Sequence, residues 1–365
     1  MLGLVVLVEC SLAGHALDFT RFYIHDWTFT GRAARTEARE CAVLCFGDSL
    51  MKFGVVPRVL EARLGGRGRA YNLAVCNGQA ASSYFLLRRA LAAGARPSAL
   101  VVDFTPHLLA AGPMHNLRQW PELVSLGEWL DLGWTARHGA FFAELSLGCL
   151  LPSVKDRDEI RGNVRALLRG EAGSHRAEIP AYVAHWRRSR GANIYPRRPS
   201  YRGEIDATNP AYFPRGWKCH PTNEAYLRRF LALAETHAIP VFWLLPPTAP
   251  QFQARRDALG LEASHERLLE RLQRAFANLT VIDGRRASPD PGLFIDQLHL
   301  GRPGAVAVSA GLAEVLSRHL DRPRTSPRWV TLPACEPGAT SVPVEDLGAV
   351  LVALKTSSRE QERER

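Results

Sequence analysis

The chain has few lysines, an odd number of cysteines and no apolar run long enough to span a bilayer. Only four of its 46 basic residues are lysines, so arginines spread over most of the 365 residues carry the net charge of +10. No dense basic block stands out, and no helix-turn-helix, RNA-binding signature or P-loop is present. We therefore interpret the basic balance as overall composition and do not expect nucleic acid as a partner.

The seven cysteines are widely spaced and include no Cys-x-x-Cys pair. An odd count without paired spacing argues against a disulfide framework and against a zinc site. The adjacent Cys219 and His220 lack further ligands at coordinating spacing, so we interpret them as structural. We expect most cysteines to be small buried side chains, and we expect neither a metal nor another cofactor.

The first segment, residues 1–37, opens with an apolar run over residues 1–8 that Glu9 interrupts. A spanning helix needs about 20 apolar residues, and the run lacks the basic start of a secretory signal. Two interpretations stay open, a remnant of a membrane anchor whose upstream half lies outside this chain and a short helix packed on the domain. Contact with a membrane, or export, is expected only through this segment.

From Cys41 onward short apolar runs alternate with amphipathic segments, which is typical of strand–helix units in a parallel sheet. We predict one α/β domain over residues 38–322, folded as a three-layer α/β/α sandwich around a central parallel sheet of about five strands. The predicted strands cover residues 42–46, 70–75, 99–104, 239–245 and 279–282, and the predicted helices cover 57–64, 83–93, 226–237, 261–276 and 303–320.

Residues 112–218 interrupt this alternation and are interpreted as an inserted cap, with a second domain as the alternative. Helical pieces near 123–132 and 159–169 precede a run of aromatic and arginine side chains. Such a run can stack on sugars and hold phosphates or carboxylates, or it can be a solvated lid face. Residues 323–365, Pro-rich and then charged, are expected to be a disordered tail. The aromatic and arginine residues are Trp186, Arg188, Tyr195, Arg197, Arg198, Tyr201 and Arg202.

The most informative local string is Val43-Leu-Cys-Phe-Gly-Asp-Ser-Leu50, in which an apolar run meets a glycine and then Ser49 just before a helical segment. A serine at a strand-to-helix turn is exposed at the carboxyl edge of a parallel sheet, where open α/β folds bind ligands. Free N–H groups of the following turn can stabilise negative charge. Taken alone, the string also fits a helix cap or a turn.

A second string, Phe294-Ile-Asp-Gln-Leu-His-Leu300, precedes the last predicted helix. A serine hydroxyl needs a base, and a histidine three residues after an aspartate can be oriented by that aspartate. Asp-x-x-His also occurs by chance, but its conjunction with a serine after the first strand is more specific. We predict Ser49 as nucleophile, His299 as base and Asp296 as the group that orients the base.

With these strings the chain resembles the SGNH (GDSL-type) hydrolase family, over about residues 41–320. Gly-Asp-Ser-Leu at 47–50 is similar to the family's nucleophile block, and Asp-Gln-Leu-His at 296–299 to its terminal block. The string from Asn72 to Gln79 resembles the second block. The resemblance implies a flavodoxin-like fold and an oxyanion hole built from the N–H groups of Ser49 and Gly78. Asp48 and Asn77 are counted with the oxyanion and substrate-binding residues.

The third block of the family, Gly-x-Asn-Asp, has no counterpart here. Its asparagine supplies an oxyanion donor in the family, whereas this chain reads Val102-Asp-Phe-Thr-Pro-His107 after the third strand. Loss of one such donor costs about 10²–10³ in rate. His107, Thr105 or Asn77 could replace the missing donor.

Two functions follow from this pattern. The first is an ester hydrolase or acyl transferase that works through an acyl-serine, with a small-molecule or glycan ester as substrate. The resemblance makes O-acylated carbohydrates and lipids plausible substrates. The alternative is a binding or scaffold protein that keeps the fold but has lost activity with the third block. The sequence does not indicate an oligomeric state.

Overall fold

The computed structural model describes residues 2–16, 20, 25–66, 68–170, 179–321, 328–334 and 342–348. Its centre is a six-stranded sheet in which every strand pair is parallel. This confirms the predicted α/β architecture, with six strands in place of about five. In their order across the sheet the strands are β2 (Arg69–Asn72), β1 (Cys41–Phe46), β3 (Ala99–Val102), β4 (Val241–Leu245), β5 (Leu279–Asp283) and β6 (Trp329–Thr331).

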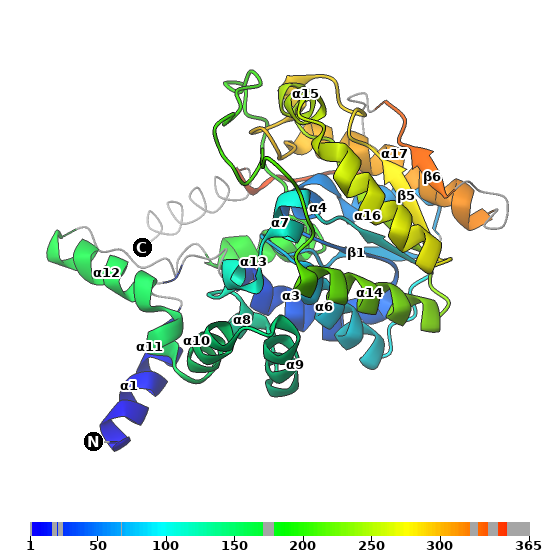
Figure 1. Cartoon of the computed structure of the whole chain (residues 1–365). Helices are drawn as coiled ribbons and strands as arrows, with labels where there is room; N and C mark the ends of the chain where they lie inside the picture. The colour runs from blue at the N-terminus through cyan, green and yellow to red at the C-terminus, as the bar shows by residue number, and fades with distance from the viewer. Residues whose placement is uncertain are drawn as a thin grey trace, which may run out of the picture.

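Helices cover both faces of the sheet, as Figure 1 shows. Side chains of β1 alternate between the two hydrophobic cores, with Leu44 and Phe46 in one and Val43 and Cys45 in the other. Because both faces are buried, the strands read as continuous apolar runs and not as alternating ones. One layer holds α3 (Asp26–Thr36), α6 (Ala80–Ala92), α14 (Pro221–Thr236) and α16 (Leu261–Ala275), and the other holds α4 (Ser49–Gly54), α5 (Pro57–Arg63) and α17 (Arg302–Asp321).

The order of the strands puts a topological switch point beside β1. The chain passes from β1 to β2 on one side and then to β3 on the other side of β1. In open α/β sheets of this kind, ligands bind outside the carboxyl ends of the strands at such a point. The carboxyl end of β1 leads into Ser49, so the fold places the predicted nucleophile there.

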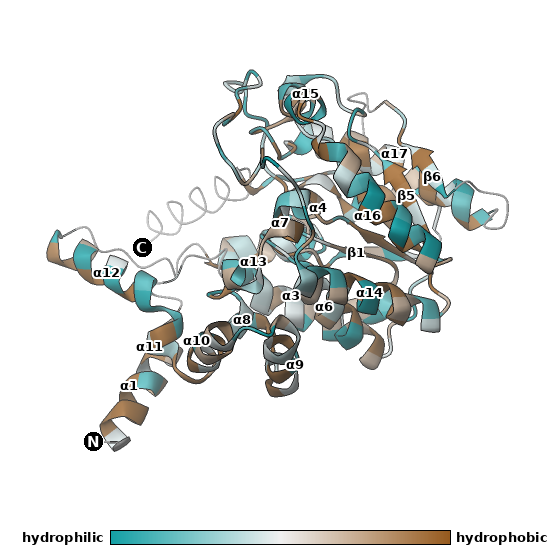
Figure 2. Cartoon of the chain, viewed as in Figure 1, coloured by the Kyte–Doolittle hydropathy of each residue, from teal (hydrophilic) through white to brown (hydrophobic). Residues whose placement is uncertain are grey.

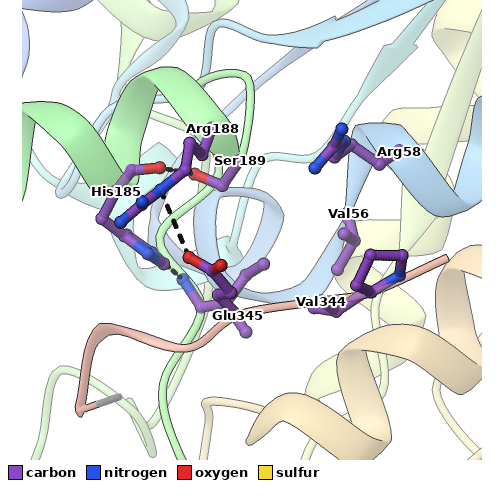
Figure 3. A pocket seen from close by; sticks show the side chains of 9 residues that line it. Val56, Arg58, His185, Arg188, Ser189, Val344 and Glu345 are labelled. Atoms are coloured by element: carbon purple, nitrogen blue, oxygen red, sulfur yellow. Dashed lines mark hydrogen bonds and ion pairs between the residues drawn. The ribbon is translucent and has the colours of Figure 1, made fainter. Parts of the chain in front are cut away.

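The sixth strand corrects the predicted strand count. It lies at residues 329–331, in a segment expected from the sequence to belong to the C-terminal tail, and it pairs with β5 through Val330 and Ile282. A run of three residues carries too little periodicity to be recognised locally. Further along, Glu345 pairs with Arg188 of α13 (Ile179–Arg188) at 3.2 Å, beside a pocket next to α5 (Figure 3). Residues 323–327, 335–341 and 349–365 of the predicted tail lie outside the described residues.

The interrupting region, residues 112–218, has two parts in the structure. Its first part is helical and lies beside the sandwich (Figure 1). Its second part, residues 189–218, returns to the carboxyl edge of the sheet, where Asn193 N donates to Lys52 O and Asp206 N donates to the Gln297 side chain. The α-helices described in the first part are α8 (Trp120–Leu123), α9 (Leu126–Ala136), α10 (Gly139–Leu150), α11 (Pro152–Lys155), α12 (Arg157–Leu168) and α13.

The predicted N-terminal apolar run lies in a helix, α1 (Leu2–Gly14), whose residues Leu4 to Val8 are exposed. Glu9 accepts hydrogen bonds from the N–H and hydroxyl of Ser153 at the start of α11. No helix among the described residues is both long and apolar enough to cross a membrane.

Candidate active site

The turn after β1 is shaped by a close approach to β3. Gly47 has φ +140°, and a Cβ at this position would lie 1.7 Å from Asp103 Oδ1. Only glycine therefore fits between β1 and the loop that follows β3. Asp48 then caps α4, since its Oδ1 accepts from Leu50 N at 2.9 Å. Ser49 is the first residue of the helix, and its N–H has no acceptor among the described residues.

The three residues predicted to form the reactive group lie together. Ser49 Oγ is 2.8 Å from His299 Nε2, although the two residues are 250 positions apart. His299 Nδ1 in turn lies 2.8 Å from Asp296 Oδ2 and 3.0 Å from Asp296 Oδ1. Serine, histidine and aspartate thus form one continuous hydrogen-bonded chain, which is the arrangement of a serine nucleophile with its base and orienting carboxylate.

The loop before α17 holds Asp296 in place by backbone hydrogen bonds. Its Oδ1 accepts from Leu298 N at 2.8 Å and from His299 N at 2.9 Å. Burial alone would raise the pKa of Asp296, but the hydrogen bond from His299 and the two backbone N–H groups outweigh it and lower the pKa. An ionised carboxylate at this position accepts the Nδ1–H of His299, which leaves the Nε2 lone pair facing the Ser49 hydroxyl.

Two buried aspartates hold the turn that carries Ser49. Asp48 and Asp103 are fully buried, and Asp103 Oδ1 accepts from Asp48 N at 2.9 Å. Asp48 Oδ2 accepts from Thr105 N at 3.0 Å and from the Thr105 hydroxyl at 2.6 Å. Burial raises the pKa of Asp48, and burial together with the nearby Asp48 raises the pKa of Asp103 well above its usual range. Asp48 therefore ties the β1 turn to the β3 loop and does not face an incoming substrate.

This pair predicts a dependence of stability on pH. The unfolded chain loses the Asp103 proton near pH 4, whereas the folded chain keeps it to higher pH. The contribution of Asp103 to stability should therefore fall as pH rises above about 4, by about 1.4 kcal/mol per pH unit while only the unfolded carboxyl is ionised. Asp103→Asn carries no such proton, so its free energy of unfolding, measured with urea at a series of pH values, should lack this contribution to the pH slope of the wild type. Asp158→Asn, at an exposed carboxylate, should keep the wild-type slope, and equal slopes for all three proteins would contradict a protonated Asp103.

Of the other residues predicted for the oxyanion hole, Gly78, Asn77 and Thr105 form hydrogen bonds with groups other than Ser49. The Gly78 N–H donates to Val75 O at 2.9 Å within a turn, so it would have to leave this bond to reach an oxyanion. Asn77 has φ +58°, is exposed, and accepts from Asn116 Nδ2 at its carbonyl. The Thr105 hydroxyl is engaged by Asp48.

Among the candidate donors, His107 has a side-chain N–H that no described residue accepts. It lies in α7 (Pro106–Ala110), and its ring packs edge-on against Tyr212 with centroids 5.1 Å apart. Burial, with the nearby charges of His115, Arg256 and His299, lowers the pKa of His107 to about 3. The imidazole is therefore neutral and carries one N–H. No described residue forms a hydrogen bond with either ring nitrogen.

One buried ion pair near the nucleophile was not recognised from the sequence. Lys52 Nζ lies 2.6 Å from Asp26 Oδ1, and both side chains are fully buried. Lys52 also donates to Ala74 O at 3.0 Å, while Asp26 Oδ2 accepts from Cys76 N at 3.1 Å. The pair thereby joins α3 and α4 to the loop that carries Gly78. The chain has only four lysines, and one of them, Lys52, follows Ser49 by three positions. This rarity was the signal in the sequence that could have pointed to Lys52.

Two pockets flank the Ser49–His299 pair. An open one is lined by Asp296 and His299 and by polar side chains that include Arg198 and Tyr201. The other is lined by the chain neighbours of this pair, Leu50 and Leu298, and it has several apolar walls. Those walls are Leu50, Phe104, Pro106, Leu245, Phe252 and Leu298.

The second pocket also has polar lining residues. It holds His265, which is 2% exposed and whose Nε2 has no hydrogen-bond partner among the described residues. Burial lowers the pKa of His265 to about 4, so the ring is neutral. The neighbouring Arg256 is paired with Glu262, and Arg285 is paired with Glu262, Glu266 and Asp283, so both guanidinium groups already have carboxylate partners.

The aromatic and arginine residues singled out from the sequence lie in different places in the structure, some packed against other side chains and some at the open pocket. Trp186 is 7% exposed and belongs to the hydrophobic core, and Tyr195 packs edge-on against Phe53 at 4.8 Å. Arg198 and Tyr201 line the open pocket. Cys219 and His220 precede α14, where His220 Nδ1 accepts from Thr222 N.

Comparison of the sequence with protein-family models and with curated proteins finds no match to either. Among the described residues no three His, Cys, Asp or Glu side chains are grouped so as to hold a metal ion.

Proposed function

We propose that this chain is a serine ester hydrolase or acyl transferase of the SGNH kind. The observation that carries the proposal is the hydrogen-bonded chain from Ser49 Oγ through His299 to Asp296. Its position at the switch point of a parallel sheet supports it, because open α/β folds bind ligands there.

In the proposed reaction Ser49 Oγ attacks an ester carbonyl, and His299 Nε2 takes the hydroxyl proton. The Asp296 carboxylate stabilises the imidazolium that results. The tetrahedral intermediate then expels the alcohol, which receives the proton from His299, and an acyl-serine remains. Water or a second hydroxyl, deprotonated by His299, attacks the acyl-serine and releases the acid or a new ester.

The oxyanion of this intermediate needs donors. The Ser49 N–H is available, because no described residue accepts from it. We propose the neutral His107 as the second donor, in place of the asparagine of the family's third block. Gly78 could join them only if the turn released its bond to Val75.

In this proposal the acyl group and the alcohol of an ester substrate bind in different pockets. The apolar walls beside Leu50 and Leu298 suit the acyl group. The open pocket with Arg198 and Tyr201 suits a polar alcohol such as a sugar or a lipid headgroup. An O-acylated carbohydrate or lipid has this division of polarity.

A second candidate function is that of a binding or scaffold protein without turnover. It is favoured by the absent third block and by the Gly78 N–H, which is already donated to Val75. An incomplete oxyanion hole would leave the reacting residues in place with little rate enhancement.

A fluorophosphonate probe separates the two functions, because it phosphonylates only an activated serine. We expect the wild-type chain to be labelled and Ser49→Ala not to be. Ser200→Ala removes an exposed hydroxyl from the open pocket and should be labelled like the wild type. Labelling of the wild type no stronger than that of Ser49→Ala would favour the scaffold function.

A further inference from the structure

Exposed apolar side chains are concentrated on four helices. Of sixteen large apolar residues that are exposed in the described part of the chain, fourteen belong to α1, α9, α10 and α12. Met114 and Leu259 are the other two. Single exposed apolar residues are ordinary on a protein surface, but a concentration of them marks a surface that binds a partner or a membrane.

Helices α9 and α10 form a hairpin whose outward stripes are apolar. Leu126, Leu130 and Trp134 recur every four residues along α9, and their exposed fractions are 64%, 49% and 84%. Leu147 and Leu150 continue the stripe on α10. The acids of α9 face the other way, since Glu128 pairs with Arg88 and Arg89, and Asp131 pairs with Arg229.

Helix α12 adds an amphipathic face with basic residues. Leu167 and Leu168 are 65% and 82% exposed and share one side of the helix with Val164. Arginines recur every four residues along the border of this side, at positions 157, 161, 165 and 169. A helix with an apolar side bordered by arginines is typical of binding to an anionic lipid surface.

The four helices are contiguous in space. Helix α1 packs on α11, α11 contacts both α10 and α12, and α10 packs on α9. Figure 2 shows these helices on one side of the α/β sandwich, with hydrophobic residues along α1, α9 and α10. In α1 the only charged side chain is Glu9, which is bound to Ser153, so the exposed side chains of this helix carry no charge.

We propose that α1, α9, α10 and α12 form a membrane-binding face that inserts into the headgroup region of an anionic bilayer. The exposed leucines and Trp134 would enter the boundary between headgroups and acyl chains, and the α12 arginines would bind anionic headgroups. The net charge of +10 favours the same partner. The sequence alone suggested membrane contact only through residues 1–37, and the structure adds three helices of the interrupting region to that surface.

Vesicle binding of the full chain tests this proposal without reference to catalysis. In co-sedimentation with phosphatidylcholine vesicles, with and without phosphatidylglycerol, the wild type should bind the anionic vesicles more tightly and lose affinity as salt is raised. Leu130→Ser with Trp134→Ser should weaken binding about tenfold or more, because two apolar side chains no longer enter the lipid. Arg161→Glu with Arg165→Glu should weaken binding to anionic vesicles by at least about tenfold.

Matched controls change the same residue types elsewhere on the surface. Leu259→Ser and Arg255→Glu replace exposed side chains of the α15 region (Pro250–Ala258 and the residue after it) and should bind vesicles like the wild type. The proposal is overturned if the wild type binds neither kind of vesicle, or if the two double variants bind as well as the controls. It is also overturned if light scattering shows a wild-type dimer that Leu130→Ser with Trp134→Ser converts to a monomer, while vesicle binding is absent.

Discussion

Asp296→Asn is expected to lower kcat for an ester substrate by about 10⁴. Asp296 Oδ1 holds two backbone N–H groups, so the amide oxygen of the asparagine should stay there and its NH₂ should take the place of Oδ2. That NH₂ would then donate to His299 Nδ1, at 2.8 Å from Oδ2 in the wild type. His299 would be forced to carry its proton on Nε2 and could no longer accept the Ser49 proton.

Steady-state kinetics with a p-nitrophenyl ester measure this effect. Asp158→Asn makes the same change at an exposed carboxylate that lines neither of the two pockets and should retain wild-type kcat. Thermal unfolding should show that both variants are folded. An Asp296→Asn protein with unchanged kcat would mean that the carboxylate does not govern the base, and the proposed mechanism would be wrong.

His107→Ala should lower kcat by about 10²–10³ with little change in KM, since an oxyanion donor acts mainly in the transition state. The prediction rests on a neutral ring with an unused N–H that lies near His299. Kinetics of the same ester, together with the rate of fluorophosphonate labelling, measure the loss.

Two further variants make the His107 result specific. His107→Asn supplies an amide N–H, which is the kind of donor used by the family that this chain resembles. It should therefore recover part of the rate that is lost in His107→Ala. His115→Ala removes a neighbouring exposed histidine and should leave kcat unchanged. If alanine has no effect at position 107, or asparagine restores nothing, His107 is not the missing donor.

The five predicted strands and the last helix lie where the apolar pattern indicated them. Each of these elements contains its own run of buried apolar residues, so the pattern can be read from the local sequence. The strand β4, Val-Phe-Trp-Leu-Leu, is buried at every position. In contrast, β6 contains three residues and is partly exposed, so its pairing with β5 depends on contacts formed after the chain has folded.

The sequence by itself determined the α/β layering and singled out the serine, histidine and aspartate that lie together in the structure, because strand periodicity and short motifs are local. Tertiary structure alone decided how these groups meet and what surrounds them. The burial of Asp103, the Lys52–Asp26 pair and the neutral ring of His107 each depend on desolvation by residues far away in the chain. The apolar face on α9, α10 and α12 likewise became visible only once the structure showed which apolar side chains the core leaves exposed. Burial and charge are properties of the folded packing, and a linear pattern does not contain them.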